Sequence, residues 1–303
     1  MTSSPVARPS PPAAAPLAVG LVGAGPWAEK AYAPMLAAGP ETRLAGVWAR
    51  RPEAARALAE RHGAPAMGSF ETLLAVCEAV AFAVPPDVQA ELGVVAARAG
   101  RHLMLDKPLA LGLEAARRLA AAVAEAGVVT QLMLTHRFRP KTAAFIAEAR
   151  AFEPIGARLS FLSSAFVAGP YATAWRREHG ALLDLGPHAL DLIEAALGPI
   201  EQLAGRGDPR RWVSLTCAHA GGAISEIALS GVLRLPQTIC RCEVFGLGGA
   251  LEFDAVAGAR DEPWSLARRT FAEAVRAGRP PELDVRHGLR LQELIDRAQR
   301  ALA

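Results

Sequence analysis

The sequence predicts an α/β protein whose first half is a doubly wound parallel sheet of Rossmann type. Up to about residue 134, short apolar runs alternate with helical stretches, which is typical of parallel strands covered by helices on both faces. After residue 135, strand-like runs follow one another across short turns, which favours an antiparallel sheet. A chain of 303 residues, 51% of them hydrophobic, is long enough for two domains.

Local signals bound the elements expected in the first half. Asp87 is expected to cap a helix after Pro85-Pro86, and Gly100 and Gly127 follow the ends of two helices. The predicted strands are Leu17–Val22, Arg43–Trp48, Glu78–Val84, His102–Leu105 and Val128–Leu134. The predicted helices are Ala28–Ala38, Pro52–Arg61, Asp87–Ala99 and Leu113–Ala126.

The second half is predicted to combine helices with a strand meander. Within Gly156–Ala165, the side chains of Leu159, Phe161 and Ser163 alternate onto one face. The other predicted strands are Trp212–Ala218, Ala223–Leu229, Ile239–Phe245 and Ala250–Phe253. The predicted helices are Lys141–Ala151, Leu182–Leu197, Trp264–Ala277 and Val285–Leu302.

A glycine turn, Gly23-x-Gly25-x-x-Ala28, joins the first strand to the first helix and predicts a dinucleotide site. Gly23 allows the tight turn, Gly25 leaves room for a pyrophosphate, and the small Ala28 lets the helix pack closely on the strand. The phosphates would face the unpaired N–H groups at the helix N-terminus. The alternative is a glycine turn in a parallel sheet that binds no ligand.

The end of the second strand indicates which dinucleotide is bound. An acid commonly holds the adenosine ribose there, but this chain has Ala49 followed by Arg50 and Arg51. A guanidinium can hold a 2′-phosphate with charge-assisted hydrogen bonds, whereas an acid would repel it. We therefore expect NADP(H) rather than NAD(H). The alternative is that both arginines are solvated charges at the start of a helix.

Two short motifs are candidates for the chemistry. Asp106-Lys107-Pro108 follows the fourth strand, at the sheet edge where ligands bind, so Lys107 is placed to polarise a carbonyl or hold an alkoxide. Asp184 and His188 are four residues apart on one helical face, where a carboxylate and an imidazole suit proton transfer. The alternatives are a surface lysine and an N-cap aspartate with a packed histidine.

Together these motifs resemble the glucose–fructose oxidoreductase, inositol dehydrogenase and MocA (Gfo/Idh/MocA) family, over nearly the whole chain after residue 16. The order and spacing of several motifs carry the resemblance, and no one of them does so alone. The matching segments are the opening glycine motif, Ala83–Asp87, Asp106–Pro108, Arg137–Pro140, Trp175-Arg176 and Gly180–His188.

The resemblance implies a Rossmann domain followed by an α+β domain with a large, mostly antiparallel open sheet. It implies metal-free hydride transfer between nicotinamide C4 and a hydroxyl or carbonyl carbon of a sugar, cyclitol or related polyol. In that mechanism Lys107 stabilises charge on the reacting oxygen and His188 moves its proton. Asp184 would hold a neighbouring hydroxyl or orient His188. The sheet face would join a homodimer or homotetramer.

The expected site is larger than these three residues. The expected cofactor contacts are Gly23, Gly25, Pro26, Trp27, Ala28, Ala49, Arg50, Arg51, Val84, Pro85, Pro86, Asp106 and Lys107. The substrate candidates are Arg137, Trp175 and Arg176, and a structural or solvated role is the favoured interpretation of the two arginines.

The chain departs from the family pattern at three places. Gln89 stands where many relatives carry a histidine, and Thr135-His136 precedes Arg137 where an asparagine is common. The link from Trp175 to Asp184 is short. These changes bear on the choice of sugar and leave the cofactor role intact. Two other functions stay open: glycoside cleavage or elimination assisted by the cofactor, and a cofactor-binding regulatory or partner protein without turnover.

Composition narrows the partners. The net charge is +3 and no Lys/Arg run is interleaved with aromatic residues, which argues against nucleic acid. No apolar run has the length of a membrane span, so we expect a cytoplasmic protein with a small-molecule substrate. Four cysteines without zinc spacing indicate buried thiols.

The expected domain organisation has three parts. Residues 1–16 are predicted to be a disordered leader rich in Pro, Ala and Ser. Residues 17–134 would form the NAD(P)-binding domain. Residues 135–303 would form the substrate and oligomerisation domain, with C-terminal helices that pack back on the first domain.

Overall fold

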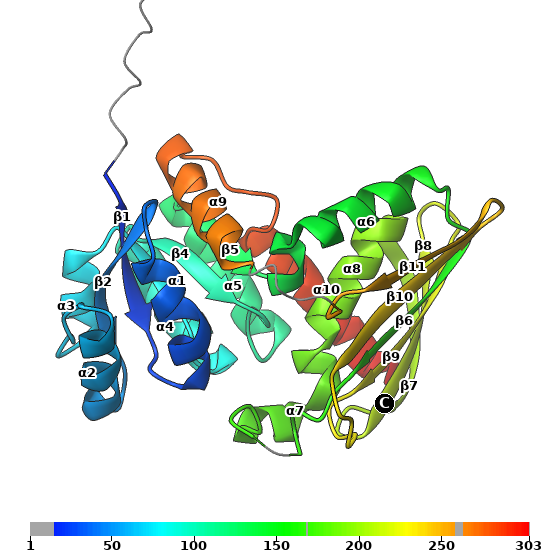
Figure 1. Cartoon of the computed structure of the whole chain (residues 1–303), viewed down its shortest axis with the longest axis horizontal. Helices are drawn as coiled ribbons and strands as arrows, with labels where there is room; N and C mark the ends of the chain where they lie inside the picture. Colours follow the sequence, from blue (N-terminus) through cyan, green and yellow to red (C-terminus); the bar gives the residue numbers. More distant parts are fainter. Residues whose placement is uncertain (1–14, 168, 258–262, 303) are drawn as a thin grey trace, which may run out of the picture.

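The computed structural model describes residues 15–167, 169–257 and 263–302, which form two lobes side by side (Figure 1). The leader predicted at residues 1–16 lies outside the described residues, apart from its last two. Within the described ranges, no helix is both long and apolar enough to cross a membrane.

The first lobe contains the predicted parallel sheet, with strand order β2-β1-β3-β4-β5. Its strands are β1 Leu17–Val22, β2 Thr42–Trp48, β3 Ala79–Phe82, β4 His102–Asp106 and β5 Thr130–Met133. Every residue of β1, β3 and β5 is buried, which is why these strands lack alternating polar residues. The chain order reverses between β1 and β3, and ligands bind at such a switch point.

Short loops join these strands to the helices of the first lobe. The helices are the π-helical turn η1 Ala28–Tyr32, α1 Ala33–Ala37, α2 Pro52–Arg61, α3 Phe70–Val76, α4 Pro86–Arg98 and α5 Leu113–Ala126. Helix α4 begins one residue earlier than predicted, because Pro85 is its N-cap and Asp87 lies in the first turn. Helix α3 was not predicted, although Ser69 and Thr72 form a capping box at its start.

The second lobe contains a six-stranded sheet of order β11-β10-β6-β9-β8-β7, antiparallel except between β6 and β9. Its strands are β6 Gly156–Leu162, β7 Ile200–Asp208, β8 Trp212–His219, β9 Ile224–Ser230, β10 Ile239–Gly246 and β11 Gly249–Asp254. The mostly antiparallel sheet is as expected. Strand β7 was missed because it is a polar, glycine-containing edge strand with only its first residue buried.

Helices of the second lobe carry the candidate residues Asp184 and His188. They are the 3-10 turn η2 Thr135–Phe138, α6 Pro140–Ala151, α7 Ala174–Asp184 and α8 Gly186–Leu197. The helix predicted from Leu182 is therefore the end of α7 followed by α8. Helix α7 bends at Gly180, whose φ is +73°, and a Cβ there would lie 2.1 Å from the carbonyl oxygen of Pro209.

The last two helices connect the lobes. Helix α9, Trp264–Ala277, contacts α1, β2 and β5 of the first lobe. Helix α10, Val285–Leu302, runs between α5 and the second sheet, with contacts to both (Figure 1). All four cysteines are buried and unpaired, as expected.

Candidate functional site

The glycine turn after β1 has the backbone geometry that its residues imply. Gly23 has a φ of +116°, and a Cβ there would lie 2.3 Å from the carbonyl oxygen of Ala83. A Cβ added at Gly25 would meet no heavy atom within 4 Å, so this position opens onto free space. Ala28, which was expected among the cofactor contacts, is fully buried beneath the turn. Its small side chain serves packing.

An open cleft of about 440 Å³ begins at this turn and runs along the ends of β1, β2 and β3. Its lining residues are Val22–Gly25, Trp48–Arg51, Ala83–Pro85 and Val88. Arg50 and Arg51 stand at the β2 end of the cleft, where the sequence predicts a 2′-phosphate. The open face at Gly25 and the size of the cleft fit a nucleotide with its phosphates at the turn.

A second cleft, of about 150 Å³, continues from the first toward the other lobe. The two clefts share Gly25 and Ala83–Pro85. The second cleft is also lined by Pro26, Trp27, Pro86, Gln89, Asp106–Pro108, Pro170, Tyr171, Thr173, Trp175 and Arg176. Apart from Ala28, every expected cofactor contact therefore lines one of two connected clefts. Tyr171, Thr173 and Gln89 were not among the expected residues.

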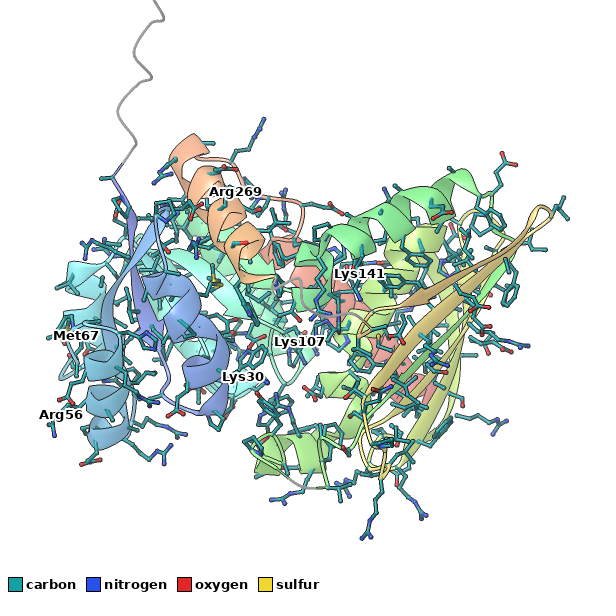
Figure 2. The ribbon with its side chains drawn as sticks, in the orientation of Figure 1. Lys30, Arg56, Met67, Lys107, Lys141 and Arg269 are labelled. Atoms are coloured by element: carbon teal, nitrogen blue, oxygen red, sulfur yellow. The ribbon has the colours of Figure 1, made fainter. Side chains whose placement is uncertain are left out.

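Lys107 lies between the two lobes and is tied to the second lobe (Figure 2). Its Nζ donates hydrogen bonds to Asp184 Oδ1 at 2.9 Å and to the Asp184 carbonyl oxygen at 2.8 Å. Arg176 Nε lies 3.1 Å from the same Oδ1. Burial alone would raise the pKa of the Asp184 carboxyl, but Lys107 and Arg176 outweigh burial and lower that pKa. Asp184 is therefore an ionised anchor for Lys107.

His188 is buried on α8 and contacts a second imidazole. Its ring lies 5.0 Å from that of His136, edge to face, and 6.1 Å from that of Phe161. The Nδ1 atoms of both histidines are buried without a hydrogen-bond partner in the described part of the chain. Among the described residues no hydrogen bond joins Asp184 to His188, because the Asp184 carboxylate pairs with Lys107 and Arg176.

The surroundings of His188 keep its ring neutral. Burial lowers the pKa of His188 well below its ordinary value, and the charges of Lys107 and His136 lower it further. Burial likewise lowers the pKa of His136 to about 4. A neutral imidazole can accept a proton at neutral pH, as a general base must.

Asp106 lines the second cleft, next to Lys107. Its Oδ1 accepts a hydrogen bond of 2.8 Å from the backbone N–H of Lys107. Burial raises the pKa of the Asp106 carboxyl to about 6, despite the opposing charges of Lys107 and Arg176. The hydrogen bond that this carboxyl accepts from the Lys107 N–H stabilises the turn that carries Lys107.

Of the three substrate candidates, two line the second cleft. The Arg176 guanidinium lies over the ring of Trp175, 4.6 Å from its centroid, and 5.9 Å from that of Tyr171. Arg137 does not line this cleft. The resemblance suggested Arg137 as a substrate contact, but its guanidinium pairs with Asp191 and Glu282, in accord with the favoured structural interpretation.

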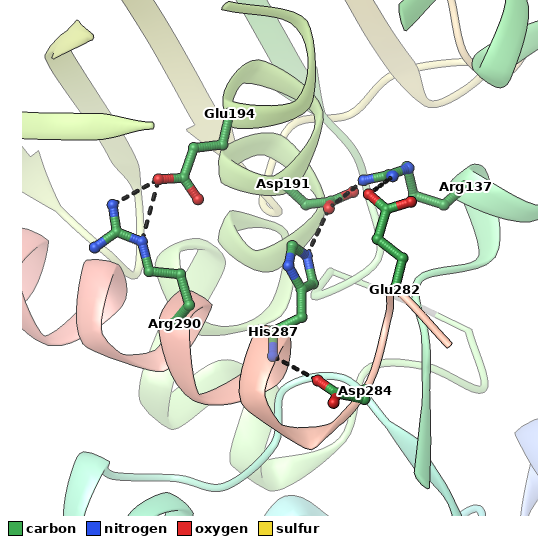
Figure 3. A network of polar contacts seen from close by, with 7 residues as sticks. All are labelled: Arg137, Asp191, Glu194, Glu282, Asp284, His287 and Arg290. Carbon is green, nitrogen blue, oxygen red and sulfur yellow. Dashed lines mark hydrogen bonds and ion pairs between the residues drawn. The ribbon is translucent and has the colours of Figure 1, made fainter. Parts of the chain in front are cut away.

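Arg137 instead belongs to an ion-pair network between η2, α8 and α10 (Figure 3). Its guanidinium contacts Asp191 Oδ1 at 2.7 Å and Glu282 Oε1 at 2.7 Å. His287 Nε2 lies 2.8 Å from the same oxygen of Asp191. This network holds α10, and with it the first lobe, against α8, which carries His188.

Replacing Arg137 with methionine is expected to lower the free energy of unfolding by about 3 kcal/mol, because the buried Asp191 carboxylate loses its main partner. The change is measured by denaturant unfolding. Glu282→Gln is the matched control, since the Glu282 side chain is 71% exposed, and it should cost less than about 1 kcal/mol. Equal losses in both variants would contradict a buried anchoring role for Arg137.

The family comparison matches the first lobe. The model described as "Oxidoreductase family, NAD-binding Rossmann fold" (GFO_IDH_MocA) matches residues 17–134, the segment that holds the glycine turn and Lys107. The first lobe therefore matches the model of the Gfo/Idh/MocA oxidoreductase family. The predicted Rossmann fold and family resemblance are thereby confirmed.

Two curated relatives and one solved structure illustrate the similarity. The 1,5-anhydro-D-fructose reductase of Ensifer adhaerens is 32% identical over 166 residues, which are 52% of this chain and 45% of the relative. The dTDP-3,4-didehydro-2,6-dideoxy-alpha-D-glucose 3-reductase of Streptomyces violaceoruber is 29% identical over 216 residues, 68% of this chain and 61% of the relative. In both cases the match spans less than two thirds of the relative's length.

The structural similarity extends over both lobes. The crystal structure of GenD2 from gentamicin A biosynthesis, in complex with NAD, aligns with a TM-score of 0.85 and 25% identity. The alignment covers 98% of this chain and 97% of that chain. This chain therefore has the two-lobed architecture of a solved structure.

Proposed function

We propose that this protein is an NAD(P)-dependent oxidoreductase that interconverts a hydroxyl and a carbonyl group of a sugar, cyclitol or related polyol. The carrying observation is the position of Lys107, which lines the second cleft and is held by Asp184 from the other lobe. The family match, the sugar-named relatives and the neutral His188 support the proposal.

Lys107, Asp184 and His188 have separate roles in the proposed reaction. Asp184 accepts two of the three N–H bonds of Lys107 Nζ, which leaves one to donate to the reacting oxygen. That bond strengthens as negative charge develops on the oxygen in oxidation. His188 lines neither cleft, but it lies near enough to Lys107 for the Lys107 charge to lower its pKa. In the proposed reaction His188 takes the hydroxyl proton in oxidation and returns it in reduction. When bound, the dinucleotide supplies the hydride acceptor or donor.

The walls of the second cleft favour a ring with an apolar face. Trp27, Tyr171 and Trp175 line the cleft, and the rings of Trp27 and Tyr171 are 6.0 Å apart. Aromatic faces pack against the C–H faces of pyranose-like rings, while Asp184 and Arg176 are paired with each other. We therefore propose a neutral polyol ring at this cleft.

For the cofactor we propose NADP(H) rather than NAD(H). Arg50 and Arg51 line the first cleft, and Ala49 stands at the position where an acid commonly holds the ribose of NAD. The double variant Arg50→Ala/Arg51→Ala is expected to weaken NADPH binding about 10- to 100-fold, since two charge-assisted contacts are lost. NADH affinity should change less than about threefold. Titration of tryptophan fluorescence measures both, because Trp48 lines the same cleft. Tighter binding of NADH by the unmodified protein would refute the preference.

The exposed face of the second sheet is the surface that we propose for a homodimer or homotetramer. Trp212 on β8 and Ile224 on β9 are 42% and 47% exposed there, which is unusual for large apolar side chains. Light scattering of the protein and of Trp212→Lys measures the oligomer size. We place the protein in the cytoplasm, where its four free thiols stay reduced.

Turnover decides the main proposal. The purified protein is incubated with NADP+ or NAD+ and a panel of sugars, sugar nucleotides and cyclitols, and absorbance of the reduced dinucleotide is followed. Product analysis by mass spectrometry distinguishes oxidation of a hydroxyl from glycoside cleavage, which releases an aglycone. A protein that binds the dinucleotide but turns over no member of the panel would favour a regulatory role.

A further inference from the structure

A buried glutamine links the cofactor cleft to the turn that carries Lys107. Gln89 lies in α4, is 1% exposed, and lines the second cleft. Its Oε1 accepts the backbone N–H of Asp106 at 2.7 Å. Its Nε2 donates to the carbonyl oxygens of Asp106 at 2.8 Å, Pro108 at 3.3 Å and Leu109 at 3.2 Å. One side chain thus contacts the backbone on both sides of Lys107.

The carboxamide suits this position because it is a donor and an acceptor in one rigid plane. The turn presents one N–H and three carbonyl groups inward, and buried backbone groups without partners are costly. A neutral imidazole, the family's common residue here, offers one donor and one acceptor. An apolar side chain of equal length offers neither.

The same helix also borders the cofactor cleft. Helix α4 begins at Pro86, and Ala83–Pro85, immediately before it, line both clefts. The backbone N–H of Gln89 donates to the Pro85 carbonyl at 3.0 Å. The first turn of α4 therefore lies between the dinucleotide cleft and the Lys107 turn.

We propose that Gln89 is a positioning residue that sets the location of Lys107 relative to the cofactor cleft. This inference rests on the proposed function for its effect on turnover, but the arrangement it describes is independent of turnover. Gln89 acts through the Asp106–Leu109 backbone, so its loss displaces the Lys107 amine and leaves the cofactor cleft in place.

The kinetic test compares two replacements. Gln89→Met keeps the length and removes all four hydrogen bonds, so kcat should fall about 10- to 100-fold. Gln89→His restores one donor and one acceptor and should recover most of the loss. Dinucleotide affinity should change less than about threefold in both variants. If kcat of Gln89→Met stays within about twofold of the unmodified enzyme, or if cofactor affinity falls as much as kcat, the proposal is overturned.

A charged replacement gives a signature that a general loss of packing would not give. In Gln89→Glu the introduced carboxylate still accepts from Asp106 N–H but faces the carbonyl oxygens of Asp106, Pro108 and Leu109. Protonation of this carboxylate restores a hydrogen-bond donor. The deficit in kcat relative to the unmodified enzyme should therefore shrink as pH falls toward about 5. A deficit in kcat that does not change with pH would contradict the positioning role of Gln89.

A second readout needs no turnover. Lys30, Lys107 and Lys141 are the only lysines in the sequence, and they lie in separate parts of the molecule (Figure 2). Lysine labelled with carbon-13 at Cε therefore gives three side-chain signals, which Lys30→Arg and Lys141→Arg assign. The Lys107 signal should move toward that of the exposed Lys30 in Gln89→Met and return in Gln89→His.

The matched control is Gln131→Met on β5. Gln131 is also buried, and its Nε2 donates to the Ala267 carbonyl at 2.9 Å and to Met133 Sδ at 3.6 Å. Gln131→Met should leave the Lys107 signal unchanged. An unmoved Lys107 signal in Gln89→Met overturns the proposal. A moved signal in a protein that turns over no sugar keeps it and instead refutes the proposed function.

Discussion

Replacement of Lys107 by methionine is expected to lower kcat about 10²- to 10³-fold, the loss found when one donor to a developing oxyanion is removed. Methionine has a similar length and no N–H donor. Lys107 lines the second cleft, and its Nζ already donates twice to Asp184, so one N–H remains for a substrate oxygen. Steady-state kinetics measures the loss.

Two controls separate chemistry from folding. Lys107→Arg keeps the charge but replaces a compact ammonium with a planar fork, so it should also lose most activity. Dinucleotide affinity should stay within about threefold of the unmodified protein in both variants. Asp184 keeps Arg176 as a partner at 3.1 Å, so the fold should survive in Lys107→Met. Undiminished turnover in Lys107→Met would refute the enzyme mechanism.

Replacement of His188 by asparagine is expected to lower kcat about 10²- to 10⁴-fold, the range for loss of a general acid or base. Cofactor affinity should be nearly unchanged, because His188 lies on α8 of the second lobe and lines neither cleft. Rapid mixing of enzyme, substrate and dinucleotide measures the chemical step, and equilibrium titration measures binding. An equal fall in both quantities would show that His188 is structural.

The pH profile tests the same residue with a definite sign. Oxidation needs the neutral imidazole, and burial lowers the pKa of His188 well below its ordinary value. The neutral form therefore persists as pH falls, and the acid limb of kcat/KM for oxidation should lie below the ordinary histidine pKa. Reduction needs the protonated form, so its rate should rise as pH falls. An acid limb near the ordinary histidine pKa would contradict this environment.

His136 offers a control for the electrostatic cause. Its ring lies 5.0 Å from that of His188, so a proton on either ring disfavours a proton on the other and lowers the pKa of His188. His136→Asn removes that repulsion. The acid limb should then move to higher pH. An unchanged limb would assign the low pKa of His188 to burial and Lys107 alone.

Local sequence signals predicted most elements because they depend on residues close in the chain. Helices α2, α5, α9 and α10 have the predicted bounds, since apolar spacing and terminal glycines act within a few residues. Strand β7 was not predicted because its sequence resembles a loop. Backbone pairing with β8 stabilises it as a strand. Helix α3 escaped because it is short, although its capping box was visible.

The candidate site was only partly predictable for the same reason. The glycine turn, Lys107 and His188 carry local signals, and each was singled out. Gln89 was noted only as a departure, since nothing near it in sequence shows that it contacts Asp106, 17 residues later. Tyr171 gave no signal, because it lies in a loop that becomes part of the cleft only when the lobes meet.

The sequence by itself determined the Rossmann fold, the glycine turn and the identity of the candidate residues, because backbone geometry and residue chemistry are local properties. Only the tertiary structure decided their partners. Lys107 and Asp184 are 77 positions apart and meet across the lobes, while Arg137 is directed away from the cleft toward Asp191 and Glu282. Side-chain pairing depends on which elements pack together, and that packing is a long-range property of the whole chain.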